Sequence, residues 1–179
     1  MKQTQKIAVG GLLTALAAAA VIASNVIPFG LYMFPAAAGV VVYLLSITAG
    51  KGIAWGSFFV VSLLSFFLCT NKEAPLCFIL FLGYYPLLKD KIEKLHLKVL
   101  QYLIKLLILN AACICIYYLM LFVFSMPADS FEFFGINMPL VFLLGVNLVF
   151  LLYDYALTVM LRAYGDKINK FVTKMTRRF

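Results

Sequence analysis

Two charged side chains of this sequence lie inside long apolar segments, where a charge is costly unless it has a partner. Lys105 lies about two helical turns inside the fifth apolar segment, and Asp154 lies about two turns inside the sixth. Their depths from the same end are similar, so an intramembrane ion pair between Lys105 and Asp154 is predicted. Such a pair either holds two helices together or relays protons or ions. Asn110 and Asn147 lie deeper in the same segments and are placed to hydrogen-bond to each other.

A second group of polar and aromatic residues lies at the opposite ends of the apolar segments. Lys72 is the sole base there, so it is a candidate for holding an anionic group of a solute. Aromatic faces stack on planar molecules, and tyrosine hydroxyls provide a polar handle. An ordinary aromatic belt with a surface ion pair would explain the same features. The predicted ligand-binding residues are Lys72, Glu73, Asn71, Tyr32, Tyr117 and Asn137.

Motifs for catalysis or nucleotide binding are missing from the sequence. It has no GxxxxGK[ST], HExxH, GxSxG or CxxC pattern, and His96 lies among lysines, where we expect it to be solvated. Cys113 and Cys115 are two residues apart on a predicted helix and point to different faces, which excludes a shared metal. Cys69 and Cys77 flank a short loop and are either a disulfide or two free thiols. The sequence therefore predicts no enzyme activity, no metal and no cofactor, and any uphill transport needs an external energy source.

The composition requires a bilayer to position these residues. The chain has 179 residues, of which 65% are hydrophobic and 12% are charged, whereas a soluble domain is nearer half apolar and a quarter charged. A membrane span needs about 20 mostly apolar residues. The fourth candidate segment is short enough to be tilted, re-entrant or shielded by its neighbours. We predict one all-α domain, residues 1–179, that is a polytopic bundle of six transmembrane helices at Ile7–Phe29, Leu31–Gly50, Ile53–Cys69, Ala74–Leu88, Val99–Ser125 and Met138–Leu161.

The basic residues predict the orientation of this bundle. Of the 15 Lys and Arg residues, one (Lys105) lies in a span, one (Lys72) lies in an outer loop, and the other 13 lie in loops on the opposite side. The positive-inside rule then places both termini in the cytoplasm (N-in/C-in) of a multi-pass protein of the cell membrane. The same rule explains the basic loops without nucleic acid. The N-terminal segment also has features of a signal peptide, whose cleavage would leave five spans.

The segment Leu88–Leu106 is predicted to be an amphipathic helix. Apolar residues recur at helical spacing, while lysines and acidic residues occupy the rest of its circumference. We expect this helix to lie at the cytoplasmic interface and then to turn into the fifth span, where it contacts the lipid surface or docks a partner.

Small residues form a stripe along the first span. Gly11, Ala15, Ala19 and Ala23 are four residues apart, so they share one helix face that another helix can approach closely. The approaching helix belongs either to this chain or to another membrane protein, and the spacing alone favours neither.

The architecture and this stripe resemble the substrate-binding (S) components of energy-coupling-factor (ECF) vitamin transporters. The chain has 179 residues, six predicted spans and both ends inside, and it begins with Lys2-Gln-Thr-Gln-Lys6 before an alanine-rich helix. In that family an AxxxA pattern on the first helix contacts the transmembrane coupling subunit. Ala15–Ala19 and Ala19–Ala23 match this pattern.

The resemblance implies a membrane-embedded subunit that binds a vitamin-like solute from outside and is energised by a coupling protein and ATPases. It places the solute at the outer loops and the outer halves of the later helices, and it does not identify the solute. The stretch Gly83-Tyr84-Tyr85-Pro86 followed by Lys89 looks like a family marker, with no physical role evident beyond ending the fourth span.

Two other functions fit the same sequence. A scaffold or assembly protein, similar to the small cell-shape factor MreD, would use the small-residue face and the basic loops and bind no solute. A homodimeric secondary carrier would use Lys105 and Asp154. A small molecule that stays bound to the purified chain would favour the solute-binding subunit.

Overall fold

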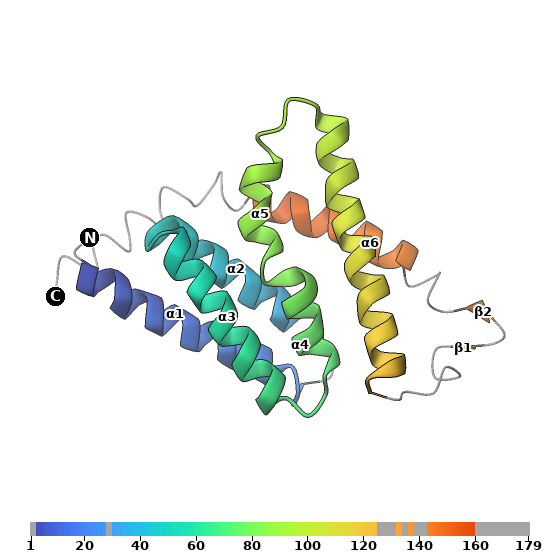
Figure 1. Cartoon of the computed structure of the whole chain (residues 1–179), viewed down its shortest axis with the longest axis horizontal. Coiled ribbons are helices and arrows are strands. Elements are labelled where there is room, and N and C mark those ends of the chain that lie inside the picture. Colours follow the sequence, from blue (N-terminus) through green and yellow to red (C-terminus); the bar gives the residue numbers. More distant parts are fainter. Residues whose placement is uncertain (1–2, 28–29, 125–131, 134–135, 138–142, 160–179) are drawn as a thin grey trace.

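The computed structural model describes residues 3–27, 30–124, 132–133, 136–137 and 143–159, and these are helical apart from short connections and one strand pair (Figure 1). β1 (Glu132–Phe133) and β2 (Ile136–Asn137) pair in antiparallel fashion, with Glu132 opposite Asn137. The helices are α1 (Gln3–Ala23), α2 (Met33–Thr48), α3 (Lys51–Leu68), α4 (Glu73–Cys77), the π-helix η2 (Phe78–Leu82), α5 (Tyr85–Ile92), α6 (Lys98–Phe122) and the Leu143–Val159 helix.

Three of these helices, α1, α3 and α6, are long and apolar enough to cross a membrane. Two shorter apolar helices, α2 and Leu143–Val159, occupy the second and sixth predicted segments. Large apolar side chains such as Leu12, Phe67 and Leu152 are more than two-thirds exposed on their outer faces, at 73%, 73% and 71%. A soluble surface does not carry so many exposed apolar side chains, so the prediction of a helical membrane protein is confirmed at this level.

Several predicted boundaries are wrong. The first helix ends at Ala23 rather than Phe29, because the N–H groups of Asn25 and Val26 turn back onto the carbonyls of Ile22 and Ala23. The fourth segment is not one α-helix: α4, η2 and α5 follow one another over residues 73–92.

The predicted amphipathic helix Leu88–Leu106 is also interrupted. α5 ends at Ile92 and α6 begins at Lys98. The side-chain amide of Gln101 donates hydrogen bonds to the backbone carbonyls of Glu93 (3.1 Å) and Leu95 (2.7 Å), both in the turn that connects the two helices. The two helices form a hairpin, the α5–α6 hairpin, so the prediction of one continuous helix is wrong.

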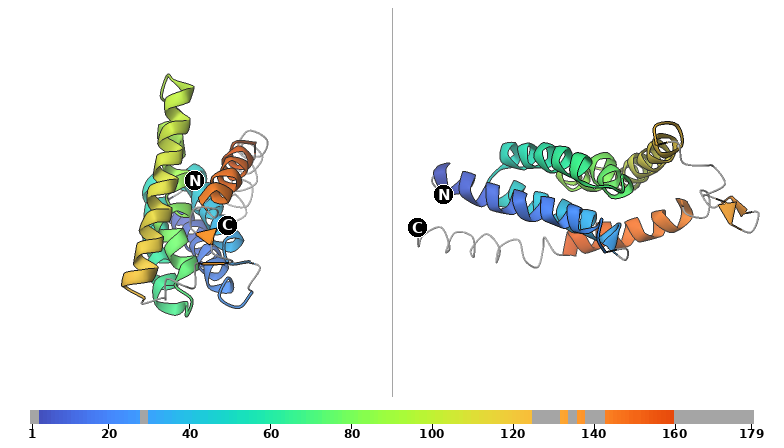
Figure 2. Two further views of the ribbon diagram at one scale, coloured as in Figure 1. Left: turned by 90° about the vertical axis from the view of Figure 1, so that its right-hand side faces the viewer. Right: turned by 90° about the horizontal axis from the view of Figure 1, so that it is seen from below.

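Helices α1, α2 and α3 pack into one bundle, whose core combines alanine and aliphatic side chains with a few aromatic rings (Figures 1 and 2). A Cβ on Gly10 would lie 2.9 Å from Cγ2 of Ile53, so α1 and α3 are in close contact. The Thr14 and Ser57 hydroxyl oxygens, also on α1 and α3, are 2.6 Å apart. A hydrogen bond between helices therefore supplements the close packing.

A second core joins η2 and α5 to α6 and the Leu143–Val159 helix. Phe81 stacks on Tyr85 with ring centroids 4.9 Å apart, and Phe150 lies edge-on to both rings. The two cores meet where α2 contacts η2: a Cβ on Gly39 would lie 2.1 Å from the carbonyl oxygen of Leu82. Only glycine permits this backbone approach.

Candidate functional site

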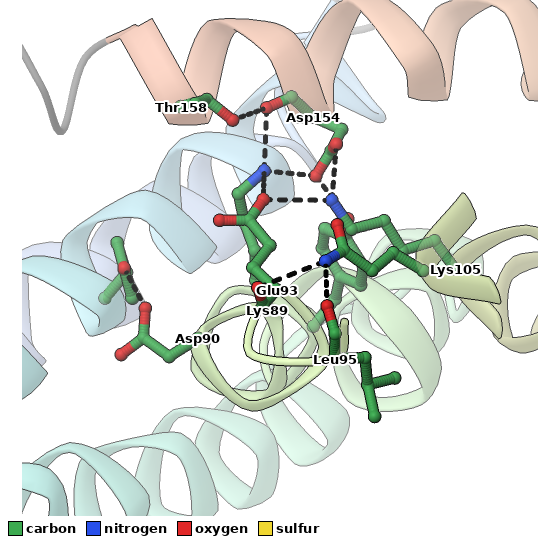
Figure 3. A network of polar contacts seen from close by, with 10 residues as sticks. Lys89, Asp90, Glu93, Leu95, Lys105, Asp154 and Thr158 are labelled. Atoms are coloured by element: carbon green, nitrogen blue, oxygen red, sulfur yellow. Dashed lines mark hydrogen bonds and ion pairs between the residues drawn. The ribbon is translucent and has the colours of Figure 1, made fainter. Parts of the chain in front are cut away.

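Short helix α5 carries Lys89, the most deeply buried charged residue in the described part of the chain. Tyr85, Lys89 and Glu93 recur every fourth residue from the start of α5 to its C-cap, so they lie on one face. That face points to Lys105 on α6 and Asp154 on the Leu143–Val159 helix (Figure 3). We call these five residues the charge cluster.

Asp154 is the centre of the charge cluster. Lys105 Nζ donates to Asp154 Oδ2 at 2.8 Å, so the structure brings together the two residues that the sequence pairs. Lys89 Nζ forms an ion pair with Asp154 Oδ1 and also donates to the Asp154 carbonyl at 2.9 Å. The Tyr85 hydroxyl donates to Oδ1 at 2.5 Å. Three helices are therefore joined through one carboxylate.

Glu93 completes the charge cluster and balances its charge. Its Oε1 lies 3.0 Å from both Lys89 Nζ and Lys105 Nζ. The side chains of Lys89, Lys105 and Asp154 are 1%, 4% and 8% exposed, and two cations face two anions with no net charge. Partial burial works to raise the pKa of Glu93, but hydrogen bonds from Lys105 and Lys89 outweigh it and lower this pKa below its usual value. Buried charges are tolerated when they are paired and hydrogen-bonded in this way.

Tyr85, Lys89 and Glu93 are the members of the charge cluster that sequence reasoning missed. The sequence counts Lys89 among the cytoplasmic loop bases and gives no role to the Gly83–Pro86 stretch. In the structure a Cβ on Gly83 would lie 2.8 Å from both the Phe58 ring and the Phe78 carbonyl, and Pro86 occupies the first turn of α5. The spacing Tyr85–Lys89–Glu93 was the available signal.

The opposite face of α5 contacts the α1–α3 bundle. The Tyr43 hydroxyl on α2 donates to Asp90 Oδ1, and Lys51 Nζ at the start of α3 lies 3.8 Å from Asp90 Oδ2. Asp90 and its neighbour Lys89 thus point to different halves of the molecule. The short helix α5 is a charged junction between the α1–α3 bundle and the α6 side.

Deeper along α6, the two predicted asparagines form a reciprocal pair. Asn110 Nδ2 donates to Asn147 Oδ1 at 3.2 Å, and Asn147 Nδ2 donates to Asn110 Oδ1 at 3.0 Å. Each amide also donates to the backbone carbonyl four residues earlier. This arrangement satisfies both side chains within the helix pair, so it fastens α6 to the Leu143–Val159 helix.

At the opposite ends of the helices, three of the predicted ligand-binding residues lie together. The Tyr32 hydroxyl donates to Glu73 Oε1 at 3.1 Å. Asn71 Oδ1 accepts the Glu73 backbone N–H at 2.9 Å, and the Asn71 backbone N–H donates to Asn25 Oδ1 at 2.9 Å. We call Asn25, Tyr32, Asn71 and Glu73 the outer cluster. It joins the loop after α1 to the loop before α4, and the sequence had not assigned Asn25 to it.

Lys72 makes contacts that the sequence did not predict. Its Nζ donates to the carbonyls of Phe66 (2.8 Å) and Cys69 (2.6 Å) and lies 5.4 Å from the Phe66 ring centroid. These carbonyls belong to the C-terminal end of α3, where a cation is favourable because the last carbonyls lack helical partners. Lys72 therefore caps α3 in this structure, whereas the carboxylate of Glu73 accepts the hydrogen bond from Tyr32.

Two predicted ligand-binding residues remain outside the outer cluster. The Tyr117 ring contacts that of Tyr118, with centroids 5.7 Å apart, in the later part of α6. Asn137 lies in β2, opposite Glu132, rather than at the start of the sixth helix. Figure 1 shows the strand pair to the right of α6, away from the loop before α4.

The small-residue stripe of α1 faces outward. Gly11, Ala15 and Ala19 are exposed and Ala23 is half-buried, whereas the face that packs on α2 and α3 is formed by Gly10, Ala17, Ala18 and Val21. A Cβ on Gly11 would meet nothing within 4 Å. Packing inside the described part of this chain therefore does not account for the stripe.

The described residues contain no group of three or more His, Cys, Asp or Glu side chains that could hold a metal ion. Cys69, Cys77, Cys113 and Cys115 are free thiols. Comparison of the chain with family models, with curated proteins and with solved structures gives no match. The functional assignment therefore rests on the residues and contacts described above.

Proposed function

We propose that this chain is the solute-binding subunit of a membrane uptake system, of the type represented by ECF S components, and that it takes up a vitamin-like small molecule. The observation that carries the proposal is the outward-facing stripe of small residues on α1, formed by Gly11, Ala15, Ala19 and Ala23. A helix with two small faces, one packed inside the chain and one open, is suited to a second membrane protein. A transmembrane coupling protein with its ATPases is the proposed partner.

The proposal includes six spans with both termini in the cytoplasm. Contacts between loops support it. Two of the three connections predicted to lie outside meet through Asn25–Asn71 and Tyr32–Glu73. At the other end, Lys51 meets Asp90, and both belong to the predicted cytoplasmic set. Two predicted spans separate the members of each pair, so the loss of one of those spans would place the members on opposite sides of the membrane.

The outer cluster is the proposed solute site. It offers a carboxylate (Glu73), a phenol (Tyr32) and two side-chain amides (Asn25 and Asn71), at the side of the bundle where α1 and α3 end and α2 and α4 begin. A neutral or cationic polar solute suits this set better than an anion, because the ammonium of Lys72 is occupied by backbone carbonyls. The proposed site therefore departs from the anion recognition expected from the sequence.

Leucine substitutions on the α1 stripe test the proposed function. We expect Ala15→Leu and Ala19→Leu each to abolish co-purification of the coupling protein and ATPases, because a leucine side chain holds the helix backbones apart. Since both alanines are exposed within this chain, the melting temperature of the solubilised variants should stay near that of the wild type. Pull-down from membranes that co-express the partner subunits measures the first effect, and a thermal shift assay measures the second.

Ala111→Leu is the matched control, because Ala111 is an exposed alanine on α6. It should leave the partners bound. Partners that stay bound to both α1 variants would contradict the proposed docking face. Equal loss from all three variants would show a general effect of added bulk and would contradict it as well.

A scaffold protein is the second candidate function, and the position of Lys72 favours it. The sole outer base caps α3 and is not offered to a solute. A scaffold would dock through the same α1 stripe but would not be stabilised by any small molecule. Thermal-shift screening against vitamins and related metabolites separates the two functions, since a ligand that binds only the folded state raises its stability.

A further inference from the structure

The tip of the α5–α6 hairpin, residues 91–100, extends beyond the α1–α3 bundle (Figures 1 and 2). Except for Ile92, all of its side chains are exposed. It carries Lys91, Lys94 and Lys98, and its one carboxylate, Glu93, is turned into the charge cluster.

The charges around the tip are segregated. Lys51, Lys89 and Lys105 are paired with three carboxylates, so this set has no net charge; the carboxylates are those of Asp90, Glu93 and Asp154. Lys91, Lys94 and Lys98 have no carboxylate partner among the residues that the structure describes, and they leave a local charge of +3. Both carboxylates of the hairpin are therefore paired with a lysine, whereas the three lysines of its tip are exposed and unmatched in the described part of the chain.

Apolar side chains accompany these lysines. Leu95, Leu97, Val99 and Leu100 are 37%, 67%, 79% and 42% exposed. A loop surrounded by water has little reason to expose four large apolar side chains among three lysines. Lysines interleaved with exposed aliphatic residues are typical of segments that lie at the boundary between headgroups and acyl chains.

We infer that the hairpin tip is a binding surface for anionic phospholipid headgroups, in which Lys91, Lys94 and Lys98 contact phosphate groups and Leu97 and Val99 enter the acyl boundary. The charge complementarity that supports this partner is the uncompensated +3 against the anionic lipids of a cytoplasmic leaflet. The inference goes beyond the proposed function and does not depend on it, because a scaffold protein would carry the same surface.

Amide hydrogen exchange in nanodiscs tests the inference. The intact chain is placed in discs of neutral phosphatidylcholine and in discs that also contain phosphatidylglycerol, and exchange is followed for residues 91–100. We expect several-fold slower exchange of these amides in the anionic discs, with the difference removed by high salt. In Lys91→Gln/Lys94→Gln/Lys98→Gln the difference should vanish, because each lysine removed weakens headgroup binding about fivefold.

Two control experiments complete the test. Lys167→Gln/Lys170→Gln/Lys174→Gln removes the same charge from the C-terminal tail and should keep the slowing at the hairpin tip. Inorganic phosphate added to neutral discs should not reproduce it. Equal exchange in the two kinds of disc, loss of the effect in the tail variant, or full slowing by inorganic phosphate would each overturn the inference. Slowing that requires an added partner protein would overturn it too.

Discussion

At the residue scale, the main feature of the charge cluster is one carboxylate that pairs with two lysines. Asp154 accepts from Lys105 and Lys89 and from the Tyr85 hydroxyl, and Glu93 balances the second positive charge. The charge cluster is neutral as a whole. We therefore expect its contribution to the free energy of unfolding to depend on its net charge more than on any single ion pair. Removing one charge leaves another buried and unmatched, whereas removing a cation and an anion together restores neutrality.

We expect Asp154→Asn to destabilise the folded chain by about 3–5 kcal/mol, because it leaves an uncompensated positive charge in a buried site. Asp154→Asn combined with Lys105→Met should recover part of this loss, since Lys89 and Glu93 remain as a neutral pair 3.0 Å apart. Thermal unfolding in detergent measures both. Asp90→Asn is the control: its partner Lys51 is 56% exposed, so its loss should cost about 0–1 kcal/mol. A double variant less stable than Asp154→Asn would contradict the neutral-cluster account.

At the element scale, the short helix α5 connects the two halves of the molecule, and the π-helix before it sets which way α5 faces. The Gly83 N–H donates to the Phe78 carbonyl at 2.8 Å, five residues back. A π-turn adds a residue to the helix and shifts the faces of everything that follows. Tyr85 and Lys89 thereby face Asp154, while Asp90 faces Tyr43. The close approach of α2 to η2 at Gly39 fixes this orientation.

Gly39→Ala tests that contact. The added Cβ would lie 2.1 Å from the Leu82 carbonyl oxygen, which is backbone and cannot rotate away. We expect a loss of about 1–3 kcal/mol in the free energy of unfolding. Gly56→Ala is the matched control, since Gly56 is exposed on α3 with nothing within 4 Å of a Cβ; alanine should be neutral there or stabilise by up to about 1 kcal/mol. Equal effects of the two changes would mean that α2 and η2 are not held this closely.

At the scale of the whole molecule, the proposed six-span orientation makes the two ends of the bundle chemically different. The outer end holds the outer cluster, and the cytoplasmic end holds the charge cluster and the hairpin tip. We expect reporters fused after Lys51 and Lys94 to be active as cytoplasmic fusions, and a reporter near Lys72 to be active outside. The same activity at Lys51 and Lys72 would contradict the alternating arrangement, because α3 separates these residues.

The sequence was sufficient to predict the apolar helices. It also predicted that Lys105 lies close to Asp154, because the depth of a residue in a span depends only on its position along a regular helix. It was insufficient for Lys89, because the π-helix breaks the regular spacing between Ala74 and Lys89 and rotates that lysine inward. It was also insufficient for Lys72: its proximity to the unpaired carbonyls of α3 depends on where that helix ends. The outward direction of the α1 stripe required the packing of α2 and α3, which hydropathy does not specify.

Native mass spectrometry of the gently solubilised wild-type chain, released from membranes that contain its partners, tests the proposed function most directly. The solute-binding account predicts a mass for the chain plus one small molecule that survives detergent removal. It also predicts a larger complex with a transmembrane coupling protein and ATPases, which Ala19→Leu abolishes while the small molecule stays bound. A chain that carries no small molecule in any complex would contradict a solute-binding subunit, even if membrane partners remain attached.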